Sequence, residues 1–551
     1  MRSGAAKCYI TAWIIKRPAA YVIQAIDPSD ERLLPITYMR TTLQSLSLVE
    51  ANTTPWLLPI TLCAFTTNQV RSTPDLIAME TVEHDNVEHY DCVAIGSGEA
   101  GKLVPFLLSG QHGKKCAIIE RKWVGGSCPN IACLPSKSVI HAANLAHETR
   151  MIHKHGLEIP GAQSLKSNMQ LVKKRKSDMV KAVNGFQDLF DKFKVELIHG
   201  EGRFISPTLI QVSGGRLLTA ENIVICTGSR ALIDASIPGL VEAKPMTHIE
   251  ILDLEVLPLH LVVIGGGYVG LEFAQAYRRF GSEVTVIERG PQVLRKEDKD
   301  VVDCLSSILE DEGIRLLTGT TVESVEGTNG DKVTVHVMSS KGKAALHGSH
   351  LLIAAGRTPN VEDLDLAKAG LDVTTAGHIS VNDQLQTTVP HIFAAGDCAG
   401  SPYFTHMGWD DHRVILRNII GSPRAEGTLG RQVPSTLFTS PELAHVGLRQ
   451  KEADARRIEY RLVKASMGLT FLRTHTLDQI ATVGFAKALL AKNNDEILRF
   501  TALAPGAGEL LPVISLAMAH GLGYQTIRDL IFAHPTLNEG LPMFFLGVEP
   551  L

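Results

Sequence analysis

The sequence has no long hydrophobic run, no strong excess of one charge and no regular cysteine pattern. No stretch reaches the ~18 apolar residues that a membrane-spanning helix needs, so we expect no membrane partner. The formal net charge is -4, so the chain has no excess of basic residues that would attract nucleic acid or an anionic membrane. We therefore expect no nucleic-acid partner either. The nine cysteines are odd in number and irregularly spaced, which excludes the disulfide framework of a small secreted protein.

The composition that remains is that of a globular protein, with 44% hydrophobic and 20% charged residues. The length of 551 residues predicts three or four domains. Residues 1–85 contain no recognisable domain, and the first 26 residues are basic and free of acids. They indicate either a poorly ordered extension or an organelle transit segment. We therefore expect a cytoplasmic location, or a mitochondrial one if this segment is a transit peptide.

A first nucleotide-binding unit begins with a buried strand predicted over residues 90–95. Three glycines follow it with G-x-G-x-x-G spacing: Gly96, Gly98 and Gly101. The first allows a tight turn, the second lets a pyrophosphate approach the positive end of the following helix, and the third permits close helix–strand packing. The next predicted strand ends in Glu120, which can accept hydrogen bonds from ribose hydroxyls.

A second unit repeats this order from residue 260, with its own glycines and terminal acid: Gly265, Gly267, Gly270 and Glu288. Two units predict two dinucleotides. A chain that binds two dinucleotides near a pair of thiols suggests a flavin that passes electrons between a nicotinamide and sulfur.

The thiol pair is Cys128 and Cys133, just after the first unit. Alone, the pair is compatible with a metal-site fragment, a chance pair or a redox couple. No third or fourth ligand lies nearby, so we expect no metal site. A helix is predicted to begin here, and a helix N-terminus lowers a thiol pKa toward a usable thiolate.

Three further strands are predicted to end at ligand-binding positions. The strand ending at Cys226 leads to Thr227 and Gly228, a second leads to Gly356, and a third ends in Asp397. From about residue 428 the pattern changes to strands (435–438 and 484–490) alternating with helices (508–520 and 524–533). His534 and Glu539 follow. We interpret the basic run 173–176 as a solvated helix face.

Together these motifs resemble the flavoprotein disulfide reductases, the class I pyridine nucleotide–disulfide oxidoreductases. The likeness covers about residues 88–545. It includes both glycine turns, the C-x4-C pair, the Ala-Gly-Asp strand end at Asp397 and the His-Pro-Thr-x-x-Glu ending. The stretches 127–137 and 404–408 resemble mercuric reductase-like members of unassigned substrate.

The resemblance implies an α/β protein with two Rossmann-like dinucleotide-binding domains and a C-terminal α+β dimerisation domain. The expected order after the extension is an FAD-binding part (86–235), an NAD(P)-binding domain (236–351), a second FAD-binding part (352–427) and the dimerisation domain (428–551). The first unit and Asp397 would hold FAD, and the second unit would hold NAD(P)H.

The resemblance also implies the chemistry of the site. Cys133 would lie against the flavin, Cys128 would face the substrate, and Lys137 would pair with Glu272 beside the flavin. His534, held by Glu539, would be the acid–base group of the partner subunit, which implies an obligate homodimer. The expected activity is NAD(P)H-dependent reduction of a small disulfide or related oxidised substrate through a Cys128–Cys133 disulfide.

Glu288 favours NADH, although Arg289 and Arg295 could bind the additional phosphate of NADPH. Dihydrolipoamide dehydrogenase is the alternative activity. Reduction of mercury or another metal ion is a further alternative, although the tail 544–551 has no cysteine pair of the kind that mercuric reductases use. An inert flavin-binding protein is the alternative from outside the enzymes.

Overall fold

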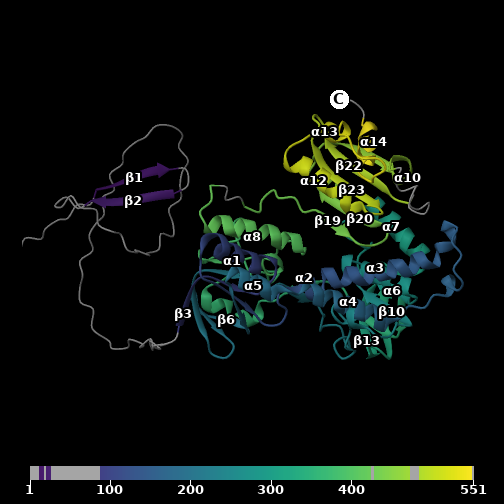
Figure 1. Ribbon diagram of the computed structural model, residues 1–551, viewed down its shortest axis with the longest axis horizontal. Helices are drawn as coiled ribbons and strands as arrows, with labels where there is room; N and C mark the ends of the chain where they lie inside the picture. The colour runs from purple at the N-terminus through teal and green to yellow at the C-terminus, as the bar shows by residue number, and fades with distance from the viewer. Residues whose placement is uncertain (1–10, 18–19, 27–86, 424–426, 472–482, 549–551) are drawn as a thin grey trace, which may run out of the picture. The chain divides into compact units, whose positions relative to one another are not determined.

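The computed structural model describes residues 11–17, 20–26, 87–423, 427–471 and 483–548 (Figure 1). The chain divides into two units, residues 1–83 and 84–551. In the first unit, β1 (Thr11–Arg17) and β2 (Ala20–Ile26) pair as an antiparallel hairpin. This antiparallel pair was not expected from the sequence, and the rest of the predicted extension lies outside the described residues.

The second unit begins with a seven-stranded sheet in the order β5-β4-β3-β8-β7-β6, with β18 also paired to β8. Strands β5, β4, β3, β8 and β18 run parallel. The strands are β3 (Val87–Ile95), β4 (Cys116–Glu120), β5 (Glu196–His199), β6 (Gly202–Ser206), β7 (Leu209–Val212), β8 (Leu217–Ile225) and β18 (Ile392–Ala394). Helices α1 (Glu99–His112) and α8 (Thr405–Ile419) pack against each other. Apolar side chains of both belong to one cluster with the sheet, which brings the start of α8 back to the first nucleotide-binding unit.

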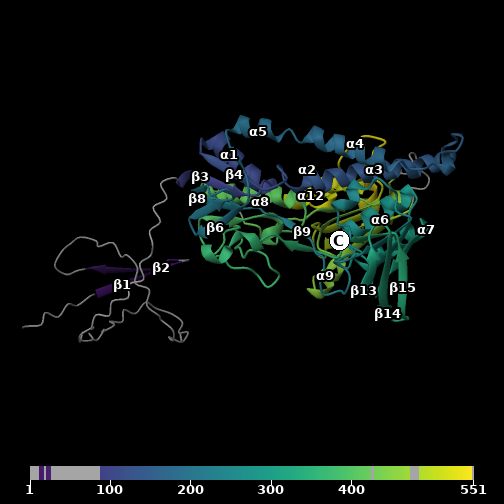
Figure 2. The same cartoon turned by 90° about the horizontal axis from the view of Figure 1, so that it is seen from below.

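A helical segment connects this sheet to the next part of the chain. It contains α2 (Ser127–Ile131), α3 (Cys133–Arg150), α4 (Met169–Val183) and α5 (Phe186–Phe193). Figure 2 shows α3 and α4 side by side. The basic run on α4 is not wholly a solvated face. Lys176 is buried and pairs at 2.6 Å with Asp253 of η3 (Glu250–Asp253).

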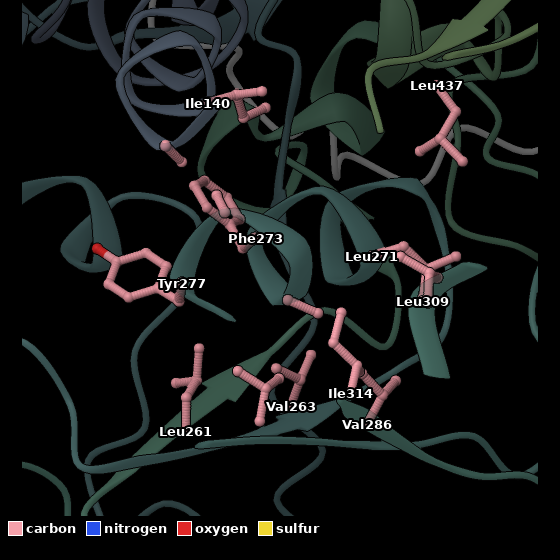
Figure 3. Close-up of a cluster of buried hydrophobic side chains, with 14 of the residues drawn as sticks. Ile140, Leu261, Val263, Leu271, Phe273, Tyr277, Val286, Leu309, Ile314 and Leu437 are labelled. Atoms are coloured by element: carbon pink, nitrogen blue, oxygen red, sulfur yellow. The ribbon is translucent and has the colours of Figure 1, made fainter. Parts of the chain in front are cut away.

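The second nucleotide-binding unit is a four-stranded parallel sheet in the order β12-β11-β10-β16. Its elements are β10 (His260–Ile264), α6 (Tyr268–Phe280), β11 (Glu283–Ile287), α7 (Lys299–Asp311), β12 (Ile314–Leu317) and β16 (His350–Ile353). Figure 3 shows α6 between Ile140 of α3 on one side and the strand residues Leu261, Val263 and Val286 on the other. Burial on both sides fixes α6, and therefore its first turn, against α3.

Two smaller sheets accompany this unit. An antiparallel sheet contains β13 (Thr321–Thr328), β14 (Lys332–Ser339) and β15 (Gly342–Gly348). Strands β9 (Ser229–Ala231) and β17 (Arg357–Pro359) pair antiparallel. Single-turn helices are η1 (Ile152–His155), η2 (Ala162–Ser164), η4 (Glu362–Leu364), η5 (Leu366–Ala369) and η6 (Gly396–Ala399).

The C-terminal part is a five-stranded antiparallel sheet in the order β19-β20-β23-β22-β21, with helices packed on it (Figure 1). The strands are β19 (Ser435–Leu437), β20 (Glu442–Gly447), β21 (Tyr460–Ser466), β22 (Phe485–Ala491) and β23 (Ile497–Ala504). The helices are α9 (Gln450–Ala455), α10 (Met467–Thr470), η8 (Ala507–Leu510), α12 (Leu511–Ala519), α13 (Tyr524–Arg528) and α14 (Gly540–Leu546).

The prediction of a helix over 524–533 is wrong beyond Arg528, where α13 ends. Two apolar residues of the predicted range, Leu530 and Ile531, do not face a core. They are 52% and 95% exposed.

Candidate functional site

The dithiol lies where two helices meet. Cys128 is the second residue of α2, and Cys133 is the first residue of α3. Ala132 separates the two helices with non-helical dihedral angles of φ -132 and ψ -100. Both cysteines are half-buried free thiols. The 18-residue length of α3 places the positive end of a long helix at Cys133, which favours a thiolate there.

The two thiols have opposite acidities. Hydrogen bonds from Cys128 and then Thr405, together with the Lys137 charge, outweigh burial and lower the pKa of Cys133 to about 6. The same Cys128–Cys133 contact, together with burial, raises the pKa of Cys128. The reduced pair therefore carries its negative charge on Cys133 and its proton on Cys128.

Thr405 was not assigned a role from the sequence. Its hydroxyl lies 3.1 Å from the Cys133 sulfur, although the two residues are far apart in the chain. Thr405 is the first residue of α8, so the start of this helix also lies at the dithiol. The only sequence signal was its position in the stretch 404–408, which resembled the family.

A lysine–carboxylate pair lies one helical turn along α3. Lys137 Nζ donates to Glu272 of α6 at 2.8 Å, and Glu272 is buried. The other Glu272 oxygen accepts from the Phe438 backbone N–H at 3.0 Å, and Lys137 Nζ lies 4.6 Å from the centre of the Phe438 ring. The structure thus brings Lys137, on the helix that carries Cys133, together with Glu272 of α6. This pairing is the one that the family resemblance implied.

The first glycine turn has the shape that a pyrophosphate requires. Gly96 has φ +95, and a Cβ there would lie 2.4 Å from the Cys226 carbonyl oxygen. A Cβ on Gly101 would lie 2.0 Å from the Gly96 oxygen, so the strand and α1 meet too closely for any side chain. Gly98, at the start of α1, has no protein atom closer than 3.7 Å to such a Cβ. This opening before the helix N–H groups fits the FAD pyrophosphate.

Glu120 lies at the carboxyl end of β4, where the ribose of a dinucleotide is expected. It accepts hydrogen bonds from the Ser97 N–H at 2.9 Å and the Ser97 hydroxyl at 2.7 Å. The backbone N–H groups of Lys122 and Trp123 bind its other oxygen at 2.8 and 3.0 Å. A ribose hydroxyl bound here would share an oxygen with one of these donors.

The other cofactor-binding turns predicted from the sequence, at Thr227–Gly228 and at Gly356, meet at the β9–β17 pair. The Asn360 side chain donates to the Thr227 carbonyl at 3.0 Å, and the Asn360 N–H donates to the Gly228 carbonyl at 3.0 Å. Gly356 immediately precedes β17, and its carbonyl accepts from the Leu232 N–H at 3.0 Å. The turns predicted separately at Thr227–Gly228 and Gly356 are therefore connected by these hydrogen bonds.

Asp397 is the second residue of η6, which follows β18. It accepts a hydrogen bond from the Ser229 hydroxyl, and Arg357 Nε lies 3.5 Å from the same carboxylate oxygen. Arg357 also donates to the Ser229 hydroxyl at 2.7 Å. Sequence reasoning missed Ser229 and Arg357, because their relation to Asp397 depends on the pairing of β9 with β17.

The second glycine turn repeats the geometry of the first. Gly265 has φ +113 and a Cβ there would lie 2.4 Å from the Ala354 oxygen, whereas Gly267 has no atom within 4 Å. A Cβ on Gly270 would lie 2.0 Å from the Gly265 oxygen. The opening at Gly267 before α6 fits the pyrophosphate of NAD(P)H.

Glu288 lies at the carboxyl end of β11. It accepts from the Gly266 N–H at 3.0 Å and the Gly290 N–H at 2.7 Å. Arg295 Nε lies 3.7 Å from the same carboxylate, and both Arg289 and Arg295 are exposed. The groups predicted to favour NADH and NADPH therefore lie side by side.

His534 and Glu539 form a pair, with His534 Nδ1 2.8 Å from Glu539 Oε2. The His534 side chain is 75% exposed, and the Thr536 N–H donates to the other Glu539 oxygen at 3.2 Å. Within the described part of a single chain, no hydrogen bond or ion pair joins His534 to Cys128 or Cys133. The structure therefore pairs these two residues without connecting them to the dithiol.

The described residues contain no group of three or more His, Cys, Asp or Glu side chains that could hold a metal ion. None of their helices is long and apolar enough to cross a membrane.

Comparisons with known proteins agree with this geometry. The family model "Pyridine nucleotide-disulphide oxidoreductase" matches residues 90–414, and the dimerisation domain of the same family matches 433–543. A mercuric reductase of Bacillus cereus is 33% identical over 84% of this chain and 72% of its own length. Dihydrolipoyl dehydrogenase 1 of Arabidopsis thaliana is 32% identical over 82% of this chain and 89% of its own.

A solved structure has the same fold. It is the Cu(II) complex of the HOCl-induced flavoprotein disulfide reductase RclA from Escherichia coli, with a TM-score of 0.74 and 30% identity. The match covers 83% of this chain and all of that one. The predicted fold class, with two dinucleotide-binding domains and a C-terminal dimerisation domain, is confirmed. Family members depend on FAD and use NAD(P)H. The chain belongs to the pyridine nucleotide-disulphide oxidoreductases and is a flavoprotein disulfide reductase.

Proposed function

We propose that Cys128 and Cys133 form the disulfide through which this flavoprotein passes electrons from NAD(P)H to a small oxidised substrate. The observation that carries the proposal is that the pKa values of the two thiols are shifted in opposite directions. Cys133 has its pKa lowered to about 6 by its contacts with Cys128, Thr405 and Lys137, whereas the pKa of Cys128 is raised. One thiol is therefore prepared to hold charge and the other to react once its proton is removed.

The residues fit both cofactors. Gly98 and Asp397 would hold FAD, while Gly267 and Glu288 would hold NAD(P)H. FAD, when bound, supplies a two-electron carrier between the nicotinamide and the disulfide. The Lys137–Glu272 pair would steady the charge that appears when electrons reach this site.

The electrons and atoms balance over two half-reactions. NAD(P)H and one proton convert the Cys128–Cys133 disulfide to two thiols and release NAD(P)⁺. Deprotonated Cys128 then attacks one sulfur of a disulfide substrate, whose S–S bond breaks and whose other sulfur leaves as a thiol. Cys133 attacks the Cys128 sulfur, which re-forms the enzyme disulfide and releases the second thiol.

Cys128 needs a base, because its pKa is raised. We infer that His534 from a second copy of the chain supplies this base, with Glu539 orienting the imidazole. The exposure of the His534 side chain and the match to a dimerisation domain support this inference. It implies an obligate homodimer. Specific activity that stays constant while dilution separates the subunits would contradict it.

We infer a preference for NADH, because the Glu288 carboxylate suits ribose hydroxyls and repels a phosphate. The nearby Arg295 is the feature that opposes this preference. Initial rates with NADH and NADPH at equal concentrations test it, and a strong preference for NADPH would refute it.

Dihydrolipoamide oxidation is the second candidate, favoured by the Arabidopsis relative and by the His534–Glu539 pair. Metal-ion reduction is a third, since one relative is named a mercuric reductase and the RclA structure is a Cu(II) complex. A cytoplasmic location, with a mitochondrial one as the alternative, belongs to the proposal as well. Fluorescent fusions with and without residues 1–78 would distinguish the two.

The test of the function is a substrate screen that follows NADH and NADPH oxidation with small disulfides, lipoamide, quinones, and Hg(II) or Cu(II). The proposal expects turnover with at least one disulfide and its loss in Cys128→Ser. Turnover that persists unchanged in Cys128→Ser would overturn it. Dihydrolipoamide-dependent NAD⁺ reduction at a higher kcat/KM would favour the second candidate.

A further inference from the structure

Three carboxylates at the start of α7 form ion pairs with side chains of the C-terminal part. They are Glu297, Asp298 and Asp300, which we call the acidic clasp. Four basic side chains of the C-terminal part surround them, which we call the basic socket: Arg449, Lys464, Lys487 and Arg499. The proposed function uses neither group.

The contacts between clasp and socket are short and shared. Asp298 pairs with Arg499 and lies 2.9 Å from Lys487 Nζ. Asp300 lies 2.6 Å from the same Lys487 nitrogen and 2.7 Å from Lys464. Glu297 accepts from Arg449 Nη2 at 2.7 Å and Nε at 3.1 Å.

Burial makes these pairs interdependent. Lys487 and Arg499 are fully buried, and Glu297 is only 2% exposed. Burial alone would raise the pKa of Asp298, but the Arg499 and Lys487 charges hold it well below its ordinary value. A buried charge that loses its partner is strongly unfavourable, so the clasp and the socket hold one another in place.

The acidic clasp lies at the end of the loop that follows Glu288. This loop, residues 289–298, is called the dinucleotide loop below. Lys451 Nζ donates to the backbone carbonyls of Arg295 at 2.6 Å and Glu297 at 3.2 Å. The Leu294 N–H donates to the Gly266 carbonyl in the glycine turn at 2.9 Å. The loop is therefore bonded to the predicted NAD(P)H site through Leu294 and to the C-terminal part through Arg295 and Glu297, so the two sets of contacts are adjacent.

The loop also places a side chain. Arg295 lies 3.7 Å from Glu288, and its own carbonyl is the acceptor for Lys451. A shift of the Arg295 backbone would move this charge relative to the carboxylate expected to bind the ribose. The dinucleotide loop is thus suited to transmit the position of the C-terminal sheet to the adenosine end of NAD(P)H.

We propose that the C-terminal part positions the NAD(P)H site through the acidic clasp and Lys451, so that Arg449 and Lys451 are positioning residues for the nicotinamide dinucleotide. The proposal rests on the second glycine unit being the NAD(P)H site. It makes the C-terminal part more than a dimerisation surface, because its sheet orders the loop beside the cofactor's ribose.

The test uses the FAD-loaded full chain with Arg449→Met and, separately, Lys451→Met. Lys451 is exposed and its bond is to a carbonyl, so this second variant leaves no buried charge unpaired and should fold. We expect KM for NADH and the Kd for NAD⁺ to rise about fivefold or more in each variant, with kcat within twofold. Arg449→Lys should recover part of the loss.

Leu490→Ala is the matched control, because Leu490 is fully buried in β22 of the same sheet but does not touch the clasp. It should lower the melting temperature without changing the NAD⁺ Kd. Variants at Arg449 and Lys451 that keep the wild-type Kd and KM would overturn the proposal. The NAD⁺ affinity is measured calorimetrically and needs no turnover. A wild-type chain that binds NAD⁺ but reduces no disulfide would therefore contradict the proposed function, while the effect of the variants on NAD⁺ affinity could still be measured.

Discussion

Replacing Thr405 by valine removes a hydroxyl without changing the shape of the side chain beside Cys133. In the wild-type chain this hydroxyl lies 3.1 Å from the Cys133 sulfur and contributes to the lowered pKa of about 6. A hydrogen bond to a charged group contributes about 1.5–3 kcal/mol. Since one pKa unit corresponds to about 1.4 kcal/mol, the pKa of Cys133 should rise by about one to two units, to about 7–8.

The assay is a pH titration of the two-electron-reduced enzyme, followed at the long-wavelength band that a thiolate gives beside oxidised flavin. The thiolate is present above the pKa and is lost as the pH falls through it. The wild-type band should therefore persist at neutral pH and disappear near pH 6, as expected from the lowered pKa. In Thr405→Val it should fade at higher pH, and Thr405→Ser should restore the wild-type midpoint. Identical midpoints for wild type and Thr405→Val would refute the assignment of Thr405.

Two further predictions concern the FAD turn and the dimer. Gly98→Ala should leave folding intact but weaken FAD binding at least tenfold, because its Cβ enters the open space before α1. Gly96→Ala should instead lower the melting temperature of the protein, since its Cβ would meet the Cys226 carbonyl at 2.4 Å; equal effects in both variants would contradict this distinction. Mixing inactive Cys128→Ser and His534→Ala chains, with subunit exchange, should restore about a quarter of wild-type activity, because half of the dimers then contain one intact site. No recovery in dimers shown to be mixed would rule out a base from the partner subunit.

Much of the site was predictable because its residues follow local patterns. Gly96 and Gly265 are required by tight turns after buried strands, and the spacing shows this without tertiary information. The Lys137–Glu272 pair could be named only by resemblance, because 135 residues separate its members. It forms because α6 is packed between α3 and its own sheet (Figure 3).

Other features depend on contacts that no local pattern encodes. Thr405 reaches Cys133 only because α8 packs back on α1, and Arg357 reaches Asp397 only because β17 pairs with β9. Lys487 lies in the strand predicted over 484–490, and Arg499 lies in β23, which was not predicted. Both charges are buried because the acidic clasp neutralises them. The helix expected beyond Arg528 is not present. There the apolar Leu530 and Ile531 are exposed, whereas at Lys487 and Arg499 charged side chains are buried.

The most direct test of the central claim is an anaerobic titration of the oxidised enzyme with NADH, followed by alkylation and mass spectrometry of the peptide containing residues 127–137. The account predicts that Cys128 and Cys133 resist alkylation before reduction and that both become alkylated after one equivalent of NADH per chain. Reduction of the flavin with no change in the alkylation of either cysteine would contradict an electron path through this pair.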